Sequence, residues 1–245
     1  TKGLSNPEHP ANCSMFSKER PCQQPLFIFR TFAPTTGQLL LATVYRLLST
    51  IRMNYLAHIY LSGNDRQRQV GNFIGDFVKG NRYEEYPAKV REGILLHRQI
   101  DSFTDSHPLV LDAIAMLRPE FGRYSGIIMD VFFDHLLASD FRHYTKGQSL
   151  RCVSANFYYA TLRYYPLLPS RVKGFLWHFI STNRLMRYAS YNGLQEAFTI
   201  MSNYKVPALR PEETIAFLRQ NHAELEERFA AFFPELEAFV QNVEV

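Results

Sequence analysis

The chain has 245 residues, of which 46% are apolar and 20% charged, with three cysteines and a formal net charge of +4. This composition fits one globular domain, or one domain with an appendage. It excludes a wholly disordered chain, a collagen-like chain and a small disulfide-stapled protein. Because cysteine is sparse, no disulfide framework supports the fold, and we predict a reducing, cytoplasmic location.

The positive charge is unevenly distributed along the chain. Residues 1–52 hold six basic and two acidic side chains, so residues 53–245 are neutral as a whole. Within that neutral part, the net charge is −3 for residues 53–140, +9 for residues 141–210 and −6 for residues 211–245. The overall excess of positive charge is therefore poor evidence for nucleic-acid binding, and we predict no nucleic-acid partner.

The N-terminal stretch differs from the rest of the chain. Residues 1–35 mix proline, serine, asparagine and threonine without a helical or strand period, which predicts an unstructured leader. Residues 38–51 contain a leucine-rich run that Arg46 interrupts and that is shorter than the ~18 apolar residues of a membrane span. We therefore predict no stable membrane insertion; an amphipathic membrane or partner helix is the alternative for this run. Met53 is the predicted natural start, with residues 1–52 as upstream sequence.

From Met53 onward, apolar residues recur at helical spacing, and no segment alternates convincingly as a strand. Asn64-Asp65 and Ser106 are placed to cap the N-termini of helices. Prolines stand at positions that we expect to be helix starts or breaks, namely Pro87, Pro108, Pro119, Pro166, Pro169, Pro207, Pro211 and Pro234. We predict an all-α fold in which residues 53–245 form a single helical domain.

One predicted helix carries acids where its surroundings are strongly apolar. Eight of the eleven residues from 127 to 137 are large and apolar, and the exceptions are Asp130, Asp134 and His135. Asp130 and Asp134 are four residues apart, so both project from one face of the helix. Unpaired carboxylates in such surroundings cost several kcal/mol each, so a metal ion or an ion pair must compensate them. Arg98 or Arg123 is the ion-pair alternative for Asp130.

Three further segments place chemistry-bearing groups among apolar residues. His97 and Asp101 are four residues apart, Asn72 and Asp76 lie among apolar neighbours between Gly71 and Gly80, and His58 lies in the first helical segment of the body. Imidazole and carboxylate without thiolate suit Mn, Fe, Mg or Zn in a partly open catalytic site. The structural alternatives are a hydrogen-bonded core histidine at His58 and a simple helical pair of His97 with Asp101. We favour a metal site because several separate segments share this pattern.

The same residues carry a family resemblance. The chain resembles the acyl carrier protein phosphodiesterase family from Met53 to about Tyr204, with a looser helical tail. Four ordered blocks carry the resemblance: Asn54-x-Leu56-Ala57-His58, Gly71-Asn72-Phe73-x-x-Asp76-Phe77-Val78-Lys79-Gly80, Gly93-Ile94-x-x-His97-Arg98-x-Ile100-Asp101-x-Phe103-Thr104-Asp105, and Asp130-x-x-x-Asp134-His135. The family is similar to the all-helical HD-type metal phosphohydrolases, which implies an HD-like helical bundle. Here the adjacent pair reads Asp134-His135 rather than His-Asp.

The resemblance implies a metal-dependent hydrolase of lipid and fatty acid metabolism. Its reaction would release 4'-phosphopantetheine from the serine of holo acyl carrier protein through metal-activated water, with manganese as the usual ion and Mg²⁺, Fe²⁺ or Zn²⁺ as alternatives. The implied metal ligands are His58, Asp76, His97, Asp130, Asp134 and His135, with Asp101 as a further ligand or an orienting residue. The implied catalytic residues are Asp76, His97 and Asp101.

The resemblance also implies a protein substrate. Acyl carrier proteins are small and acidic, so the +9 stretch would steer and orient them. The implied substrate-binding residues are Lys79 and Arg98 for phosphate, and Arg163 and Arg171 for the carrier. Two alternatives remain open: an HD-type nucleotidase or cyclic-nucleotide phosphodiesterase, and a non-catalytic helical binding module. The oligomeric state does not follow from the sequence.

Overall fold

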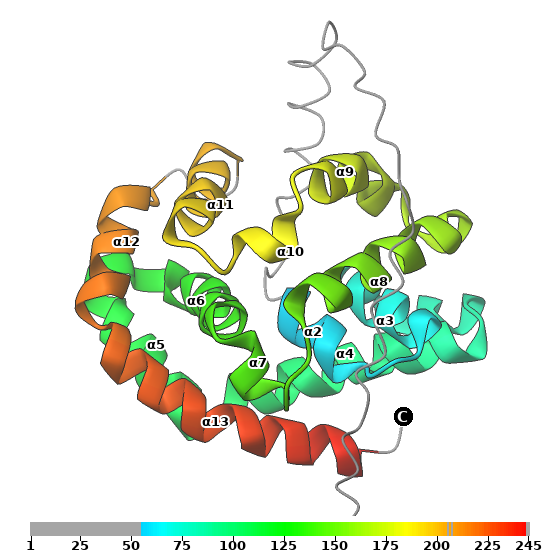
Figure 1. The fold of residues 1–245 in the computed structure, drawn as a ribbon, viewed down its shortest axis with the longest axis horizontal. Helices are drawn as coiled ribbons and strands as arrows, with labels where there is room; N and C mark the ends of the chain where they lie inside the picture. The colour runs from blue at the N-terminus through cyan, green and yellow to red at the C-terminus, as the bar shows by residue number, and fades with distance from the viewer. Residues whose placement is uncertain (1–54, 205, 207, 244–245) are drawn as a thin grey trace, which may run out of the picture. The chain divides into compact units, whose positions relative to one another are not determined.

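The computed structural model of the protein describes residues 55–204, 206 and 208–243. In this part every regular element is an α-helix or a 3-10 helix, which confirms the predicted all-α class (Figure 1). The predicted leader and Met53 lie outside the described residues. No helix in the described part is both long enough and apolar enough to span a bilayer.

The elements follow one another through short connections. The first half of the described chain contains α2 (Tyr55–Leu61), α3 (Arg66–Ile74), η1 (Gly75–Phe77), η2 (Gly80–Glu85), α4 (Ala88–Ser106), α5 (Pro108–Phe121), η3 (Gly122–Tyr124), α6 (Ser125–Ser139) and α7 (Phe141–Tyr144). The second half contains α8 (Leu150–Arg163), η4 (Tyr165–Leu167), α9 (Ser170–Ser181), α10 (Arg184–Arg187), α11 (Tyr191–Tyr204), α12 (Pro211–Gln220) and α13 (His222–Asn242).

Glycines bring α3 and α4 into close contact. A Cβ at Gly71 would lie 2.0 Å from the Val90 carbonyl oxygen, and a Cβ at Gly93 would lie 2.2 Å from the Arg68 carbonyl oxygen. Neither position accepts a side chain without moving backbone, because the nearest atoms at both positions belong to the main chain. The two helices therefore pack backbone to backbone, which holds the side chains of η1 and α4 next to each other.

Capping fixes the helix ends in ways that agree only partly with the sequence. Asp65 is the predicted N-cap of α3, and its carboxylate accepts from the backbone N–H groups of Gln67 and Arg68. Ser106, in contrast, ends α4 instead of capping α5; that cap is His107, whose ring accepts from the Leu109 N–H. His107, just before Pro108, is expected from the sequence to be a loop or cap residue rather than the acid for a leaving group, and its cap requires the tautomer that leaves Nδ1 as an acceptor.

Most of the prolines expected at helix starts or breaks lie at helix starts, but Pro119 lies inside α5 and marks no break. Pro108 and Pro211 lie in the first turns of α5 and α12, where the missing N–H costs nothing. Pro234 lies inside α13, so the predicted break at that position is wrong. α13 contacts α4, α5 and α6 along its length, and these tertiary contacts hold the helix together through the proline (Figure 1).

The core surrounds α6, where every residue from Val131 to Ala138 is buried. α6 contacts α2, α5 and α13, whereas α3 contacts α2, α4 and α8. α2 therefore lies between α6 and the α3–α4 pair. This arrangement places His58 of α2 beside Asp101 of α4 and the first turn of α2 against Asp134 of α6.

Candidate metal and active site

The structure brings together His58, His97 and Asp101, which come from α2 and α4. One ligand atom from each lies within 4.8 Å of the others, and within the described part of the chain they form the group suited to a metal ion. Asp101 bridges the two rings: its Oδ1 lies 3.2 Å from His58 Nε2, and its Oδ2 lies 3.4 Å from His97 Nε2. Both histidines are buried.

A side-chain relay sets the tautomer of His58. His58 Nδ1 lies 2.7 Å from Asn72 Oδ1, while Asn72 Nδ2 donates to Ser62 Oγ and Ser62 Oγ donates to the His58 carbonyl. Because the Asn72 oxygen only accepts, His58 Nδ1 must carry the proton. The lone pair of His58 therefore resides on Nε2, the atom that faces Asp101, as a metal ligand requires.

His97 stacks on His58 and depends on a glycine opposite it. The ring centroids are 4.3 Å apart with an interplanar angle of 30°. A Cβ at Gly75 would lie 2.4 Å from His97 Cγ, so only glycine leaves room for this ring. In the described structure neither ring nitrogen of His97 has a hydrogen-bond partner, and the same is true of His58 Nε2, although all three atoms are buried.

Asp76 connects this group to a surface cavity. Its Oδ1 lies 3.6 Å from His97 Nε2, and the same residue lines a cavity of about 600 Å³. Two chain segments form the cavity, and its lining residues are Asp76, Phe77, Val78, Lys79, Arg82, Tyr86, Pro166, Leu167, Leu168, Pro169, Ser170 and Arg171. One wall therefore carries cations beside the buried histidines, as a phosphate site requires.

Lys79 and Arg171 both line the cavity, whereas Arg98 is not among its lining residues. Arg98 Nη2 donates to the carbonyl oxygens of Val78, at 3.0 Å, and Gly80, at 2.8 Å. Its guanidinium also lies 5.1 Å from the centre of the Tyr83 ring. Arg98 thus ties α4 to the loop that carries Lys79. Arg163, the other predicted contact, lies exposed at the end of α8 with its guanidinium 5.4 Å from the centre of the Tyr164 ring.

Asp134 is held by backbone groups of α2 and lies outside the His58 group. Its two carboxylate oxygens accept from the N–H groups of Leu56, at 2.9 Å, and Ala57, at 3.0 Å. These donors belong to the first turn of α2, where no intrahelical acceptor exists. Burial raises the pKa of Asp134 to about 7, because desolvation outweighs the two hydrogen bonds, which lower it. The carboxylate therefore anchors the helix that carries His58.

His135 also faces away from that group. Its Nδ1 lies 2.7 Å from the Tyr188 carbonyl oxygen and must donate to it. The centre of its ring lies 4.9 Å from the centre of the Tyr191 ring. Burial lowers the pKa of His135. Asp130 lies half-buried on α6, and its charge acts on Asp134 by raising the pKa of that carboxyl. Asp130, Asp134 and His135 are thus outside the group of His58, His97 and Asp101, although the charge of His58 acts on Asp134 by lowering its pKa.

Gly75 is the residue of this site that the sequence did not single out as functional, whereas Asn72 was grouped with Asp76 as a candidate but was given no role. Asn72 lies in the block that contains Asp76, and Gly75 directly precedes Asp76. The signal at Asn72 was its amide side chain at a fully buried helical position. A buried amide needs partners for all its polar atoms, so it indicates a specific polar contact. Which partner it would find depended on the packing of α2 against α3.

The donor set fits a divalent cation. Two neutral imidazole nitrogens and the oxygens of Asp101 and Asp76 are ligands that Mn²⁺, Fe²⁺ and Zn²⁺ accept in catalytic sites. The buried nitrogens without hydrogen-bond partners support this assignment, because buried polar atoms in native proteins are almost always satisfied.

Comparisons with known proteins agree with this picture. A family model described as acyl carrier protein phosphodiesterase matches residues 53–236. Curated proteins named acyl carrier protein phosphodiesterase are similar: that of Salmonella agona is 34% identical over 194 residues, covering 76% of this chain and 96% of the relative. That of Yersinia pestis is 28% identical over 193 residues, covering 79% of this chain and 100% of the relative. No solved structure matches the chain.

Proposed function

Since this chain belongs to the acyl carrier protein phosphodiesterase family, we propose that it hydrolyses the phosphodiester joining 4'-phosphopantetheine to a serine of holo acyl carrier protein. Water attacks phosphorus, the bond from phosphorus to the serine oxygen breaks, and the serine oxygen takes up a proton. The products are the apo carrier and free phosphopantetheine. The observation that carries the proposal is Asp76, which lies beside the buried His97 and also forms part of the cation-lined cavity.

The proposed ligands are His58, His97, Asp101 and Asp76. When bound there, a divalent cation supplies a more acidic water and neutralises charge on a phosphate oxygen. Asn72 keeps His58 in the tautomer that leaves Nε2 free to coordinate, and Asp101 orients both rings. Manganese is the ion that the family resemblance favours.

The cavity residues take the proposed roles of holding phosphate and accepting a proton. Lys79 contributes a point charge and Arg171 a two-pronged donor to the phosphate oxygens. Asp76 is the carboxylate that faces the cavity, so it is suited to accept the proton of the attacking water. Arg98 is proposed to position Lys79 through the backbone of Val78 and Gly80.

The test is turnover of holo acyl carrier protein, followed by mass spectrometry of the carrier. The wild-type protein should remove the phosphopantetheine mass in the presence of Mn²⁺, and Asp76→Ala should not, while its circular dichroism stays that of a folded helical protein. Full activity of Asp76→Ala would refute the residue assignment. Hydrolysis of a nucleotide panel with no carrier turnover would favour the nucleotidase alternative, and purified protein that binds no metal would favour a binding module.

Charge at the carrier contact gives a second test of the proposed substrate. Arg163 is exposed on α8 and belongs to the +9 stretch, in which Glu196 is the only acid. Arg163→Glu should raise KM for holo carrier severalfold at low ionic strength, and added salt should remove most of the difference, because exposed charges are screened. An unchanged KM at low salt would remove Arg163 from the docking surface.

A further inference from the structure

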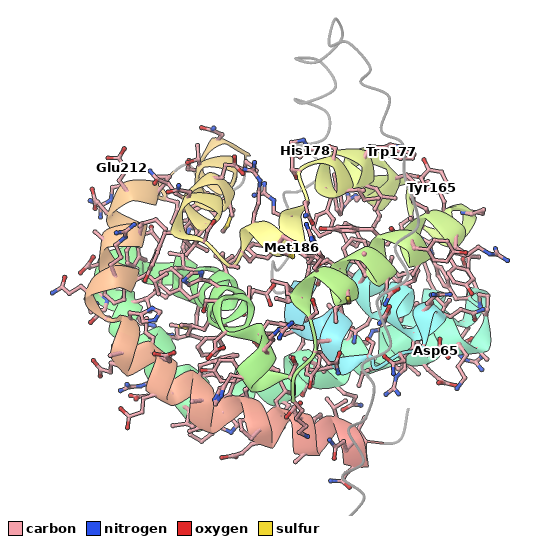
Figure 2. All side chains as sticks on the ribbon, in the orientation of Figure 1. Asp65, Tyr165, Trp177, His178, Met186 and Glu212 are labelled. Carbon is pink, nitrogen blue, oxygen red and sulfur yellow. The ribbon has the colours of Figure 1, made fainter. Side chains whose placement is uncertain are left out.

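α9 carries an exposed tryptophan with an aromatic neighbour. Trp177 is 61% exposed, an unusual state for so large an apolar side chain. The centre of the half-buried Tyr165 ring, from η4, lies 6.5 Å from the centre of the Trp177 ring. Figure 2 labels both side chains near α9. The fold buries one side of Tyr165 against the core but leaves most of Trp177 uncovered, and the two rings together form an aromatic patch.

Cations border this patch. Lys173 Nζ lies 5.2 Å from the centre of the Tyr165 ring and donates to the Pro166 carbonyl oxygen at 3.3 Å. Glu196 is the only acid among residues 141–210, and it is paired with Arg184 and Arg187 instead. The aromatic patch is therefore set in a positively charged segment.

The patch is continuous with the cavity. Pro166 and Arg171 line the cavity and flank Tyr165 and Lys173 in the chain. Trp177 follows Arg171 by six positions, which is about 9 Å along a helix axis. In a substrate whose reacting phosphate lies beside Arg171, the group attached to that phosphate would therefore lie over Trp177.

We infer that Trp177, Tyr165 and Lys173 form the docking surface for the protein part of the substrate, an acyl carrier protein, while its phosphopantetheine arm lies in the cavity. The inference rests on the proposed function. Tryptophan and tyrosine with neighbouring cations are the residue types that dominate binding energy at protein interfaces. An acidic carrier matches the charge around the patch, and the continuity with the cavity selects the substrate over an unrelated partner.

Intrinsic fluorescence can report on this contact without a label, because Trp177 is the only tryptophan in the chain. Apo acyl carrier protein, the product, should bind the wild-type protein without turnover and shift the Trp177 emission to the blue as water leaves the indole. The Trp177→Phe protein supplies the background of the same titration. The change should saturate with carrier concentration and weaken with salt. A titration without any emission change, up to the KM for holo carrier, would overturn the inference.

Kinetics separate docking from chemistry. Trp177→Ala should raise KM for holo carrier at least about tenfold with kcat little changed, as for removal of an interface anchor. Hydrolysis of bis(p-nitrophenyl) phosphate, which has no protein part, should be unaffected. Leu111→Ala is the matched control, because Leu111 is 49% exposed but lies on α5; its KM should equal that of the wild type.

The outcomes distinguish the inference from the proposed function. If the wild-type protein does not process holo carrier, the proposed function fails. If it does, and Trp177→Ala has an unchanged KM, the docking surface alone is overturned. Self-association of the wild-type protein that Trp177→Ala abolishes, with unchanged KM, would assign the patch to a second copy of this chain and likewise overturn the inference.

Discussion

α4 and α6 each place a carboxylate and a histidine in the interior, but the partners of these side chains differ in kind. On α4, His97 and Asp101 meet His58 and Asp76, and the imidazole nitrogens that face the carboxylates make no hydrogen bond in the described structure. On α6, Asp134 accepts from two backbone N–H groups, and His135 donates through Nδ1 to a backbone carbonyl. His135 Nε2 is also buried without a hydrogen-bond partner among the described residues, but there no carboxylate joins it in a group suited to a metal ion.

The difference separates two uses of a buried polar side chain. A carboxylate that satisfies the first turn of a neighbouring helix stabilises the fold, since those N–H groups have no other acceptor. Buried imidazole nitrogens that lie beside carboxylates without a hydrogen bond destabilise the fold until a cation binds between them. The α4 group should therefore matter for metal binding and activity, and the α6 pair for stability.

Replacing the bridging carboxylate should have the largest effect. Asp101→Asn keeps the shape of the side chain but removes the charge between His58 and His97. We expect loss of bound metal and a fall in activity of at least ~1000-fold, as when a metal enzyme loses its ion, with little change in unfolding of the metal-free protein. Metal analysis and carrier turnover measure this, and Asp105→Asn, one turn further along α4, is the control. Retention of metal by Asp101→Asn would contradict the assignment.

Removing the α2 anchor should act on stability. Asp134→Ala leaves the N–H groups of Leu56 and Ala57 without acceptors in a buried region, so the free energy of unfolding should fall by about 2–4 kcal/mol. Urea unfolding of the metal-free protein measures this change. Glu120→Ala, an exposed acid on α5, should change it by less than about 0.5 kcal/mol. An unchanged stability together with complete loss of metal would instead place Asp134 among the ligands.

The relay behind His58 should have an intermediate effect. Asn72→Ala removes the acceptor of His58 Nδ1, so the ring loses its fixed tautomer and orientation. Metal affinity should fall about 10- to 100-fold, and excess metal should restore most of the activity. Calorimetric titration with Mn²⁺ measures the affinity, and Ser62→Ala, one step further along the relay, should lose less. Equal affinities of Asn72→Ala and wild type would argue that packing alone orients His58.

The smallest expected effect belongs to His135. His135→Leu fills the position with an apolar side chain but leaves the Tyr188 carbonyl oxygen without its donor. The free energy of unfolding should therefore fall by about 1–2 kcal/mol. Bound metal and KM for the carrier should stay at wild-type values, and thermal unfolding with metal analysis reports both quantities. Loss of metal in a folded His135→Leu protein would break the distinction between α4 and α6.

Local spacing predicted part of this site and could not predict the rest. The four-residue interval between His97 and Asp101 put both on one face of a helix, and the structure has them 3.4 Å apart. The same interval and the same apolar surroundings made Asp130 and Asp134 look equivalent to that pair. A helical period specifies which face of a helix a side chain occupies, but it does not specify which other element covers that face.

By itself, the sequence determined the all-helical class, the blocks that carry the family resemblance and the concentration of positive charge in residues 141–210, because periodicity, motif order and composition are properties of the chain. Only the tertiary structure decided that His58 joins His97, that Asp134 anchors α2 and that Trp177 lies exposed beside the cavity. The reason is physical: a buried polar group is defined by its partners, and the packing of helices distant in sequence supplies those partners.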